Sequence, residues 1–329
     1  MTAIRDSNSL ITAVIGGAGF IGRAVVAELL AQGRQVLVLG REQTPVPALP
    51  AGVRYAYSPA DDDGATLAQA LAGADELVDL AYATVPGTSY QDPVNDILVN
   101  LPEAVRLFEL AATLPLKKIV WISSGGTVYG RTSVDMIAES HPTLPLSPYG
   151  ITKLAIEKYA HMYFESKGLP IVCVRPSNAF GEGQRTYSGQ GFIATAIAST
   201  LDGRELTLFG EQGTIRDYLH VADVATGIVA ALLHGRPGEV YNLGSSQGLT
   251  NRQVLETLAP LATETGHEVK VRVQPPRPFD VPANVLNCAK LRAETGWQPR
   301  LAFAQALAQT WRWYAAQHQA AASVKQLTT

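Results

Sequence analysis

A tyrosine and a lysine spaced four residues apart, Tyr149 and Lys153, are the side chains of this sequence best suited to acid–base chemistry. On a helix, both side chains lie on one face and can share one site. A tyrosine that exchanges a proton near neutral pH needs assistance, because its unperturbed pKa is about 10. A neighbouring ammonium favours the phenolate, so the pair predicts a catalytic site in which Tyr149 moves a proton and Lys153 assists it.

A glycine run gives a second chemical signal. The segment Gly16-Gly17-Ala18-Gly19-Phe20-Ile21-Gly22 fits both a G-x-G-x-x-G and a wider G-x-x-G-x-x-G spacing, and it joins an apolar stretch, Leu10–Ile15, to a helical pattern, Phe20–Gln32. Glycine at such a turn lets backbone N–H groups at a helix N-terminus approach a pyrophosphate. The run therefore predicts a dinucleotide site, and the alternative is a glycine-rich turn that binds no ligand.

The residues after the second strand bear on which dinucleotide binds. An acidic residue about 20 positions beyond the glycines usually recognises a free ribose 2′-hydroxyl, whereas this sequence has Gly40 followed by Arg41. A guanidinium suits a 2′-phosphate, so we expect NADP in preference to NAD. The alternative is that Arg41 is a solvated loop residue and Glu42 supplies the acidic group. The positive ring of an oxidised nicotinamide would add to the effect of Lys153 on Tyr149.

Repeated strand and helix patterns must position these residues. Buried strands are expected at Leu10–Ile15, Gln35–Leu39, Glu76–Ala81, Lys118–Ser123 and Ile171–Arg175, and helices at Phe20–Gln32, Leu101–Thr113 and Tyr149–Lys167. Continuous apolar strands that alternate with helices indicate an α/β fold with a doubly wound, Rossmann-like parallel sheet covered by helices on both faces.

The texture of the sequence changes after Arg175, where Gly, Ser, Asn and Gln become frequent and the strands become short. We expect a dinucleotide-binding domain over residues 1–176 and a smaller, mixed α/β, mainly substrate-binding domain over residues 177–329. Some segments of about 208–245 are expected to return to the first sheet. Helices are expected at Phe192–Asp202, Val221–Leu233, Asn251–Thr265 and Phe303–Gln317, and strands at Leu206–Leu208 and Val240–Leu243.

The composition excludes several other classes of function. A net charge of -3 without a run of Lys or Arg argues against nucleic acid as a partner. The two cysteines, Cys173 and Cys288, form no metal-binding or disulfide pattern, so we expect a reducing cytoplasm and no metal. Residues 1–9 lack the apolar core of a signal peptide, and no apolar run reaches the roughly 18 residues that span a bilayer. We therefore expect no membrane partner.

These patterns together resemble the extended short-chain dehydrogenase/reductase family, in particular its nucleotide-sugar epimerases, dehydratases and 4-keto-sugar reductases. The resemblance covers nearly the whole chain. It rests on Gly16–Gly22, Leu80-Ala81, Ile122–Gly130, Tyr149–Lys153, Arg175–Asn178, Arg216–Asp223, Tyr241–Gly244 and Gly296-Trp297.

The resemblance implies roles for the matched residues. Tyr149 would be the acid/base, and Lys153 would orient the nicotinamide ribose and lower the pKa of the tyrosine. Asp61 would approach the adenine. The residues expected to bind the cofactor are Gly16, Gly19, Phe20, Ile21, Gly22, Arg41, Asp61, Leu80, Ala81, Asn100, Ser123, Tyr149, Lys153 and Pro176.

A nucleotide-diphosphate sugar is the substrate class that the resemblance implies. Asn178 would contact its sugar or nucleotide portion, and Arg216 and Arg277 would clamp its diphosphate, for which guanidinium groups are chemically suited. The alternative for Arg216 is an ion pair with Asp217 or Asp223. The family also implies a homodimer formed through the helices near residues 101–113 and 149–167.

One departure from the family pattern concerns a hydroxyl group. Many relatives have Ser or Thr where this sequence has Gly125, and that hydroxyl binds the sugar oxygen beside the tyrosine. Ser124 is the nearest substitute and is expected to complete the catalytic set, with Thr127 behind it, both near the substrate. The alternative for Ser124 is a backbone-capping role at the end of a strand.

The same segment bears on the reaction. A dehydratase carries an Asp-Glu pair where this sequence has Gly126 and Thr127, which argues against dehydration. The overall signature favours a nucleotide-sugar 4-epimerase. Gly40-Arg41 favours instead an NADPH-dependent reductase of a nucleotide-linked 4-keto-6-deoxy sugar. A third alternative is a dinucleotide-sensing regulator without catalysis, against which the retention of Tyr149 and Lys153 argues.

Overall fold

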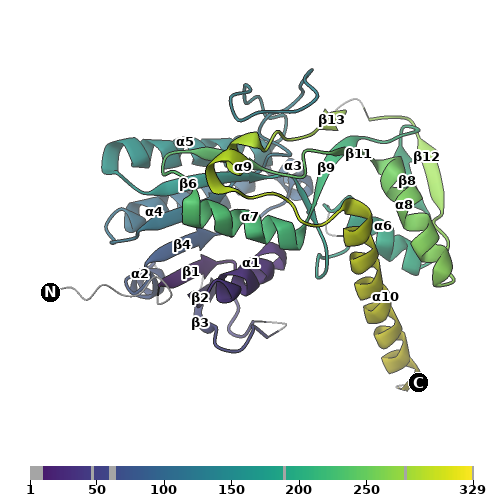
Figure 1. Cartoon of the computed structure of the whole chain (residues 1–329), viewed down its shortest axis with the longest axis horizontal. Coiled ribbons are helices and arrows are strands. Elements are labelled where there is room, and N and C mark those ends of the chain that lie inside the picture. The colour runs from purple at the N-terminus through teal and green to yellow at the C-terminus, as the bar shows by residue number, and fades with distance from the viewer. Residues whose placement is uncertain (1–9, 46–47, 59–63, 188–189, 278–279, 328–329) are drawn as a thin grey trace.

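A seven-stranded parallel sheet has the strand order β10-β6-β5-β4-β1-β2-β3 (Figure 1). The sheet and the helices that cover it are called the first unit below. The computed structural model describes residues 10–45, 48–58, 64–187, 190–277 and 280–327, without the side chains of residues 322–327. The strands are β1 (Ile11–Ile15), β2 (Gln35–Gly40), β3 (Arg54–Tyr57), β4 (Glu76–Asp79), β5 (Lys118–Ile122), β6 (Ile171–Pro176) and β10 (Val240–Leu243). All neighbouring pairs are parallel, which confirms the predicted doubly wound α/β fold.

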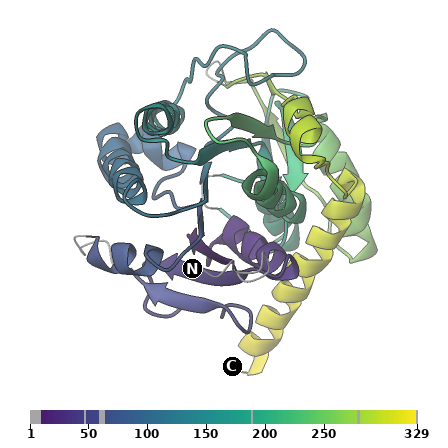
Figure 2. The same ribbon diagram turned by 60° about the vertical axis from the view of Figure 1, so that its left-hand side comes forward.

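Helices cover both faces of this sheet, as Figures 1 and 2 show. Alternate residues of a strand point to opposite faces, so each strand supplies two cores. Val14 of β1 packs in the core that contains residues of α1 (Phe20–Ala31) and α7 (Val221–His234). Its neighbour Ala13 packs in the core that contains residues of α4 (Pro93–Ala111) and α5 (Pro148–Lys167). This double coverage explains why the strands are apolar throughout.

The second unit lies beside the carboxyl ends of the strands of the first sheet (Figure 1). Its helices are α6 (Phe192–Leu201), α8 (Asn251–Glu264) and α10 (Phe303–Leu327), and its strands are β7 (Asn178–Phe180), β8 (Leu206–Phe209), β9 (Ile215–His220), β11 (Gly248–Thr250), β12 (Val271–Gln274) and β13 (Ala283–Asn284). Strand β9 pairs with β7, β11 and β13, whereas β12 pairs with β8. Within residues 208–245, α7 and β10 belong to the first unit and β9 to the second.

The structure differs from the predicted elements mainly at their ends and in short segments. The predicted strand Glu76–Ala81 ends at Asp79, because the Asp79 carboxylate accepts a 3.0 Å hydrogen bond from the backbone N–H of Ala81 and turns the chain. Helix α10 continues to Leu327, well beyond the predicted end at Gln317. The short helices α2 (Ala65–Leu71), α3 (Pro86–Gln91) and α9 (Ala289–Thr295) were not predicted.

Two further observations concern the described residues as a whole. None of their helices is both long and apolar enough to cross a membrane. They also contain no cluster of three or more His, Cys, Asp or Glu side chains that could hold a metal ion. Cys173 and Cys288 are both buried free thiols.

Candidate active site

The glycine run forms a tight turn between β1 and α1. Gly16 has a φ of +77°, which L side chains rarely adopt, and its carbonyl accepts a 3.0 Å hydrogen bond from the Gly19 N–H. A Cβ on Gly22 would lie 2.2 Å from the Gly16 carbonyl oxygen, so only glycine permits this close approach. No side chain of the described residues caps the N-terminus of α1 at Gly19. Its N–H groups are therefore positioned to bind an anion such as a pyrophosphate.

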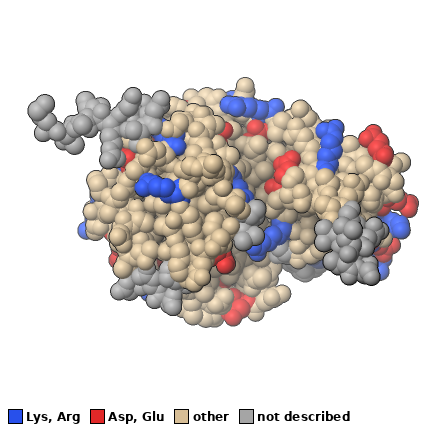
Figure 3. Space-filling model, turned by 90° about the horizontal axis from the view of Figure 1, so that it is seen from below, with Lys and Arg blue, Asp and Glu red and all other residues tan. Residues whose placement is uncertain are grey.

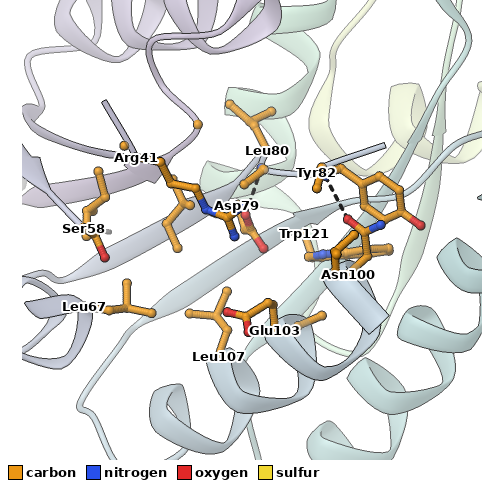
Figure 4. Close-up of a pocket in the computed structure, with 18 of the residues that line it drawn as sticks. Arg41, Ser58, Leu67, Asp79, Leu80, Tyr82, Asn100, Glu103, Leu107 and Trp121 are labelled. Carbon is orange, nitrogen blue, oxygen red and sulfur yellow. Dashed lines mark hydrogen bonds between the residues drawn. The ribbon is translucent and has the colours of Figure 1, made fainter. Parts of the chain in front are cut away.

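A cavity of about 480 Å³ opens beside this turn at the carboxyl ends of the strands (Figure 4). Six of the residues expected to bind a cofactor line it: Gly16, Gly19, Arg41, Leu80, Ala81 and Asn100. A Cβ on Gly16 would lie 3.1 Å from the Ala81 backbone nitrogen, so a side chain there would crowd the backbone after β4. The glycine turn, the N–H groups of α1 and the cavity beside them fit a dinucleotide.

Several residues that line this cavity were not predicted, namely Ser58, Leu67, Asp79, Tyr82, Glu103 and Trp121. Ser58 and Tyr82 follow the ends of β3 and β4, where residues of a parallel sheet face the ligand crevice. That rule could have identified them. Glu103 lies on α4 and Trp121 within β5, and the sequence contains no motif that marks either of them.

The end of β2 contains no carboxylate. A Cβ on Gly40 would lie 2.6 Å from the Tyr55 hydroxyl, so an acidic side chain does not fit there unless Tyr55 moves. Arg41 lines the cavity, and Figure 4 shows its side chain directed into it. Glu42 does not line the cavity; its carbonyl accepts a 2.5 Å hydrogen bond from the Tyr55 hydroxyl. Asp61 lies outside the described residues.

The expected catalytic pair lies at the start of α5. The Ser147 hydroxyl accepts a 3.0 Å hydrogen bond from the Gly150 N–H and caps the helix, and Pro148 occupies its first turn. Tyr149 and Lys153 consequently lie one turn apart, with the Lys153 Nζ 5.8 Å from the centroid of the Tyr149 ring. Tyr149 is half-buried and Lys153 is only 3% exposed. The structure thus brings the two side chains together.

Burial dominates the electrostatics of the pair. Burial raises the pKa of the Tyr149 phenol, and Asp96 adds to this effect, whereas a hydrogen bond with Ser124 opposes it. The expected lowering of this pKa by Lys153 stays a prediction. Burial lowers the pKa of the Lys153 ammonium, against the attraction of Asp79 and other carboxylates. The Lys153 Nζ donates a hydrogen bond to the Ile122 carbonyl, at 2.7 Å.

Gly125 stands where a hydroxyl was expected. A Cβ at this position would lie 2.5 Å from the Leu286 Cδ1 and 2.9 Å from the Arg175 carbonyl oxygen. Leu286 is fully buried and occupies the space that a serine side chain would need. Ser124 instead provides the hydroxyl that bonds to Tyr149. The Thr127 hydroxyl is buried without a hydrogen-bond partner among the described residues.

Three of the residues expected to bind the substrate, Asn178, Arg216 and Arg277, lie in the second unit. Asn178 begins β7, and its side-chain oxygen lies 3.5 Å from where a Cβ on Gly126 would be. Arg216 lies on β9, and Asp280 is close enough to act on its charge. The Arg277 guanidinium pairs with the same Asp280 at 3.0 Å and stacks on the Phe209 ring. The negative charge of Asp280 therefore acts on both arginines.

The alternative role of Arg216 as an ion-pair partner of Asp217 or Asp223 is wrong. Both carboxylates are buried, and both accept hydrogen bonds from backbone N–H groups. Asp217 accepts hydrogen bonds from Ser245, Ser246 and Leu286, and Asp223 accepts them from Arg300 and Leu301. Among the described residues, no carboxylate lies within ion-pair distance of Arg216.

A second cavity, of about 1340 Å³, lies between the two units and meets the first at Gly19 and Tyr82. Phe20 lines this second cavity, whereas Ile21, Gly22, Ser123 and Pro176 line neither of the two. Arg216 and Arg277 line neither cavity as well. On the face shown in Figure 3, acidic and basic side chains are interspersed among uncharged surface.

Comparisons with known proteins agree with this geometry. A model of the NAD dependent epimerase/dehydratase family matches residues 12–244. UDP-glucose 4-epimerase of Mycolicibacterium smegmatis is 32% identical over 306 residues, which cover 91% of this chain and 96% of that protein. The structure of Thermus thermophilus UDP-glucose 4-epimerase in complex with NAD has a TM-score of 0.84 at 33% identity, and the match covers 93% of this chain and 99% of that one.

A second solved structure shows the same relationship with a sugar nucleotide bound. The Thermotoga maritima UDP-glucose 4-epimerase with UDP-glucose has a TM-score of 0.86 at 28% identity. The match covers 94% of this chain and 99% of that one. Both units of the chain are therefore included in the similarity.

Proposed function

Because the chain belongs to the NAD-dependent epimerase/dehydratase family, we propose that it is a nucleotide-sugar 4-epimerase, which oxidises C4 of the sugar transiently and reduces it on the other face. The chain is that of an NAD(P)-dependent enzyme of the extended short-chain dehydrogenase/reductase type. One observation supports the proposal most directly. Tyr149 bonds to Ser124 and lies beside Lys153, and Tyr82, which lines the dinucleotide cavity, contacts both members of the pair.

The proposed roles follow from this arrangement. When bound, the oxidised cofactor supplies the hydride acceptor and a positive ring that favours the phenolate. Tyr149 takes the proton of the C4 hydroxyl as that carbon is oxidised and returns a proton when the ketone is reduced. Ser124 holds the same sugar oxygen in reach of Tyr149. Lys153 orients the ribose beside the reacting carbon.

The substrate would be a nucleotide-diphosphate sugar held by the second unit. Asn178 would contact the sugar or nucleotide, and Arg216 and Arg277 would bind the diphosphate on either side of Asp280. Dehydration is not proposed, because Gly126 and Thr127 supply no carboxylate acid or base beside Tyr149.

Turnover with UDP-sugars tests this proposal. Incubation with UDP-glucose, UDP-N-acetylglucosamine or UDP-glucuronic acid should yield the C4 epimer of one of them, resolved by chromatography, without net change in nicotinamide absorbance. Tyr149→Phe should lower turnover by roughly 10²- to 10⁴-fold and leave the Kd for cofactor nearly unchanged. Tyr90→Phe, at an exposed tyrosine of α3, is the matched control. Full turnover of Tyr149→Phe would contradict the acid–base role.

Gly40 and Arg41 favour a second candidate, an NADPH-dependent reductase of a nucleotide-linked 4-keto-6-deoxy sugar. The cavity contains Arg41 in the region where a 2′-phosphate would be expected, and the end of β2 has no acidic group to repel one. Stoichiometric consumption of NADPH with such a 4-keto sugar would establish the reductase. A steady nicotinamide absorbance during epimer formation would exclude it.

We also propose that the protein is a homodimer. Helices α4 and α5 carry large exposed apolar side chains, which favour burial against a second copy. They are Val94, Ile97 and Leu98 of α4 and Ile151, Tyr159 and Met162 of α5. The two helices pack against each other and so present these side chains from one layer of the molecule (Figure 2).

A further inference from the structure

The Lys153 ammonium is buried without a close counter-ion. Its side chain is 3% exposed, and among the described residues no carboxylate lies within ion-pair distance of its Nζ. Within the described part of the chain, its Nζ donates a hydrogen bond to the Ile122 carbonyl. A buried charge is costly unless other groups replace its hydration, so the source of that replacement decides whether Lys153 stays protonated.

The aromatic rings of Tyr82 and Trp121 replace part of the hydration that the Lys153 ammonium loses on burial. The Nζ lies 3.9 Å from the centroid of the Tyr82 ring and 4.7 Å from that of the Trp121 ring. Both distances are within the roughly 6 Å over which an aromatic face attracts a cation, and the attraction is strongest at desolvated sites. Trp121 is 1% exposed on β5, and Figure 4 shows Tyr82 and Trp121 at the same end of the cavity.

We propose that Tyr82 and Trp121 form an aromatic box that keeps the Lys153 ammonium charged and holds it beside the dinucleotide cavity, which both rings line. Tyr82 is then a positioning residue that acts through Lys153. The inference rests on the proposed role of Lys153 in the reaction. Nothing in the glycine run or in the Tyr149–Lys153 spacing indicates such a box.

Hydrogen bonds hold the backbone on both sides of Tyr82. The N–H of Ala81 bonds to Asp79, and the N–H of Ala83 donates a 2.8 Å hydrogen bond to Asn100. The ring also packs edge-on against Tyr149, with 4.9 Å between the centroids. One ring therefore contacts both members of the catalytic pair. Tyr82 and Gly19 also line both cavities, whereas Trp121 lines the first alone.

Three carboxylates surround the box at longer range. Asp79 on β4, Asp96 on α4 and Glu157 on α5 each favour the charged form of Lys153, against the burial that lowers its pKa. Each is engaged elsewhere: Asp79 by Ala81, Asp96 by Thr152, and Glu157 by Arg175 in a 2.6 Å ion pair. A substitution at Tyr82 leaves all three carboxylates in the protein. A substitution at Tyr82 therefore tests the contribution of the ring.

The experiment compares Tyr82→Phe, which keeps an aromatic face, with Tyr82→Leu, which removes it. Lysine side-chain NMR, with the Lys153 signal assigned by Lys153→Arg, reports the pKa of this ammonium directly. Loss of the ring disfavours the charged form, so Tyr82→Leu should lower the Lys153 pKa by roughly one unit relative to Tyr82→Phe. The alkaline limits of cofactor affinity and of kcat/KM should move to lower pH by the same amount.

A surface control separates the box from a general effect of losing a tyrosine. Tyr187→Leu removes an exposed ring that lies 5.6 Å from the Arg204 guanidinium and should leave the Lys153 pKa unchanged. An equal Lys153 pKa in Tyr82→Leu and Tyr82→Phe would overturn the proposal. Since the NMR titration needs neither substrate nor cofactor, its outcome is independent of whether the protein is an epimerase.

A graded series covers the case in which Tyr82→Leu does not fold. Fluorinated phenylalanines at position 82 keep the shape of the ring and weaken its negative face step by step. The Lys153 pKa should fall with each added fluorine, relative to Tyr82→Phe. A constant pKa across the series would reject the aromatic box.

Discussion

At the scale of single residues, Gly125 explains why the expected hydroxyl is absent. The carbonyl of Gly125 accepts a 3.1 Å hydrogen bond from the buried Asn284 side chain, and Leu286 fills the space beside its Cα. The second unit therefore packs directly onto the segment that carries Ser124. A larger side chain at position 125 would separate the two surfaces.

Gly125→Ser should accordingly destabilise the protein by about 1–3 kcal/mol, the usual cost of overpacking a buried site. Urea denaturation measures the change. Gly73→Ser is the matched control, because a Cβ on Gly73 meets no atom within 4 Å. The double variant Gly125→Ser/Leu286→Ala should recover part of the loss relative to Leu286→Ala alone. Equal free energies of unfolding for both serine variants would contradict this packing argument.

Arg41 is the residue on which the choice of cofactor is expected to depend. If its guanidinium binds a 2′-phosphate, Arg41→Ala should weaken NADP binding roughly 10- to 100-fold and leave NAD binding nearly unchanged. Fluorescence titration of cofactor-free protein with both dinucleotides measures this. Arg54→Ala, at an exposed arginine of β3 outside the cavity, should change neither affinity. A parallel loss of NAD and NADP affinity would exclude the selective role of Arg41.

At the scale of elements, the start of α5 positions both catalytic candidates. Ser147→Ala removes the cap and should cost about 1 kcal/mol of stability. Ser166→Ala, whose exposed hydroxyl bonds to the Met162 carbonyl near the other end of the same helix, should cost less. Urea denaturation of both variants checks the difference. Equal costs would show that the cap does not hold the helix start.

The first unit was largely predictable, because each of its buried strands reads as an apolar run beside a recognisable helix. The glycine turn, β1 and α1 agree with the sequence pattern to within one residue. Short strands such as β13 were not predictable, since their residues pair only after β9 is in place. The site shows the same contrast. Gly16 and Arg41 could be found from the glycine run and the position about 20 residues after it, whereas Tyr82 and Trp121 meet Lys153 only through tertiary packing.

At the scale of the whole molecule, the exposed apolar side chains of α4 and α5 predict self-association. Leu98→Arg places a charge in the proposed interface and should convert a dimer into a monomer of 35.1 kDa, as measured by sedimentation. Leu144→Arg alters an equally exposed leucine of a loop, 68% against 64% exposed, and should leave the dimer intact. A monomeric parent protein would refute the proposed interface.

The two cysteines have a practical consequence for labelling. Cys173 lies inside β6, and burial raises the pKa of its thiol; burial also raises the pKa of Cys288, to about 12. Thiols with such pKa values hold almost no thiolate at neutral pH, and alkylating reagents attack the thiolate. A single cysteine introduced on the surface would therefore react selectively with a maleimide dye in the folded protein. The native chain is in this respect already suited to site-specific labelling for single-molecule fluorescence.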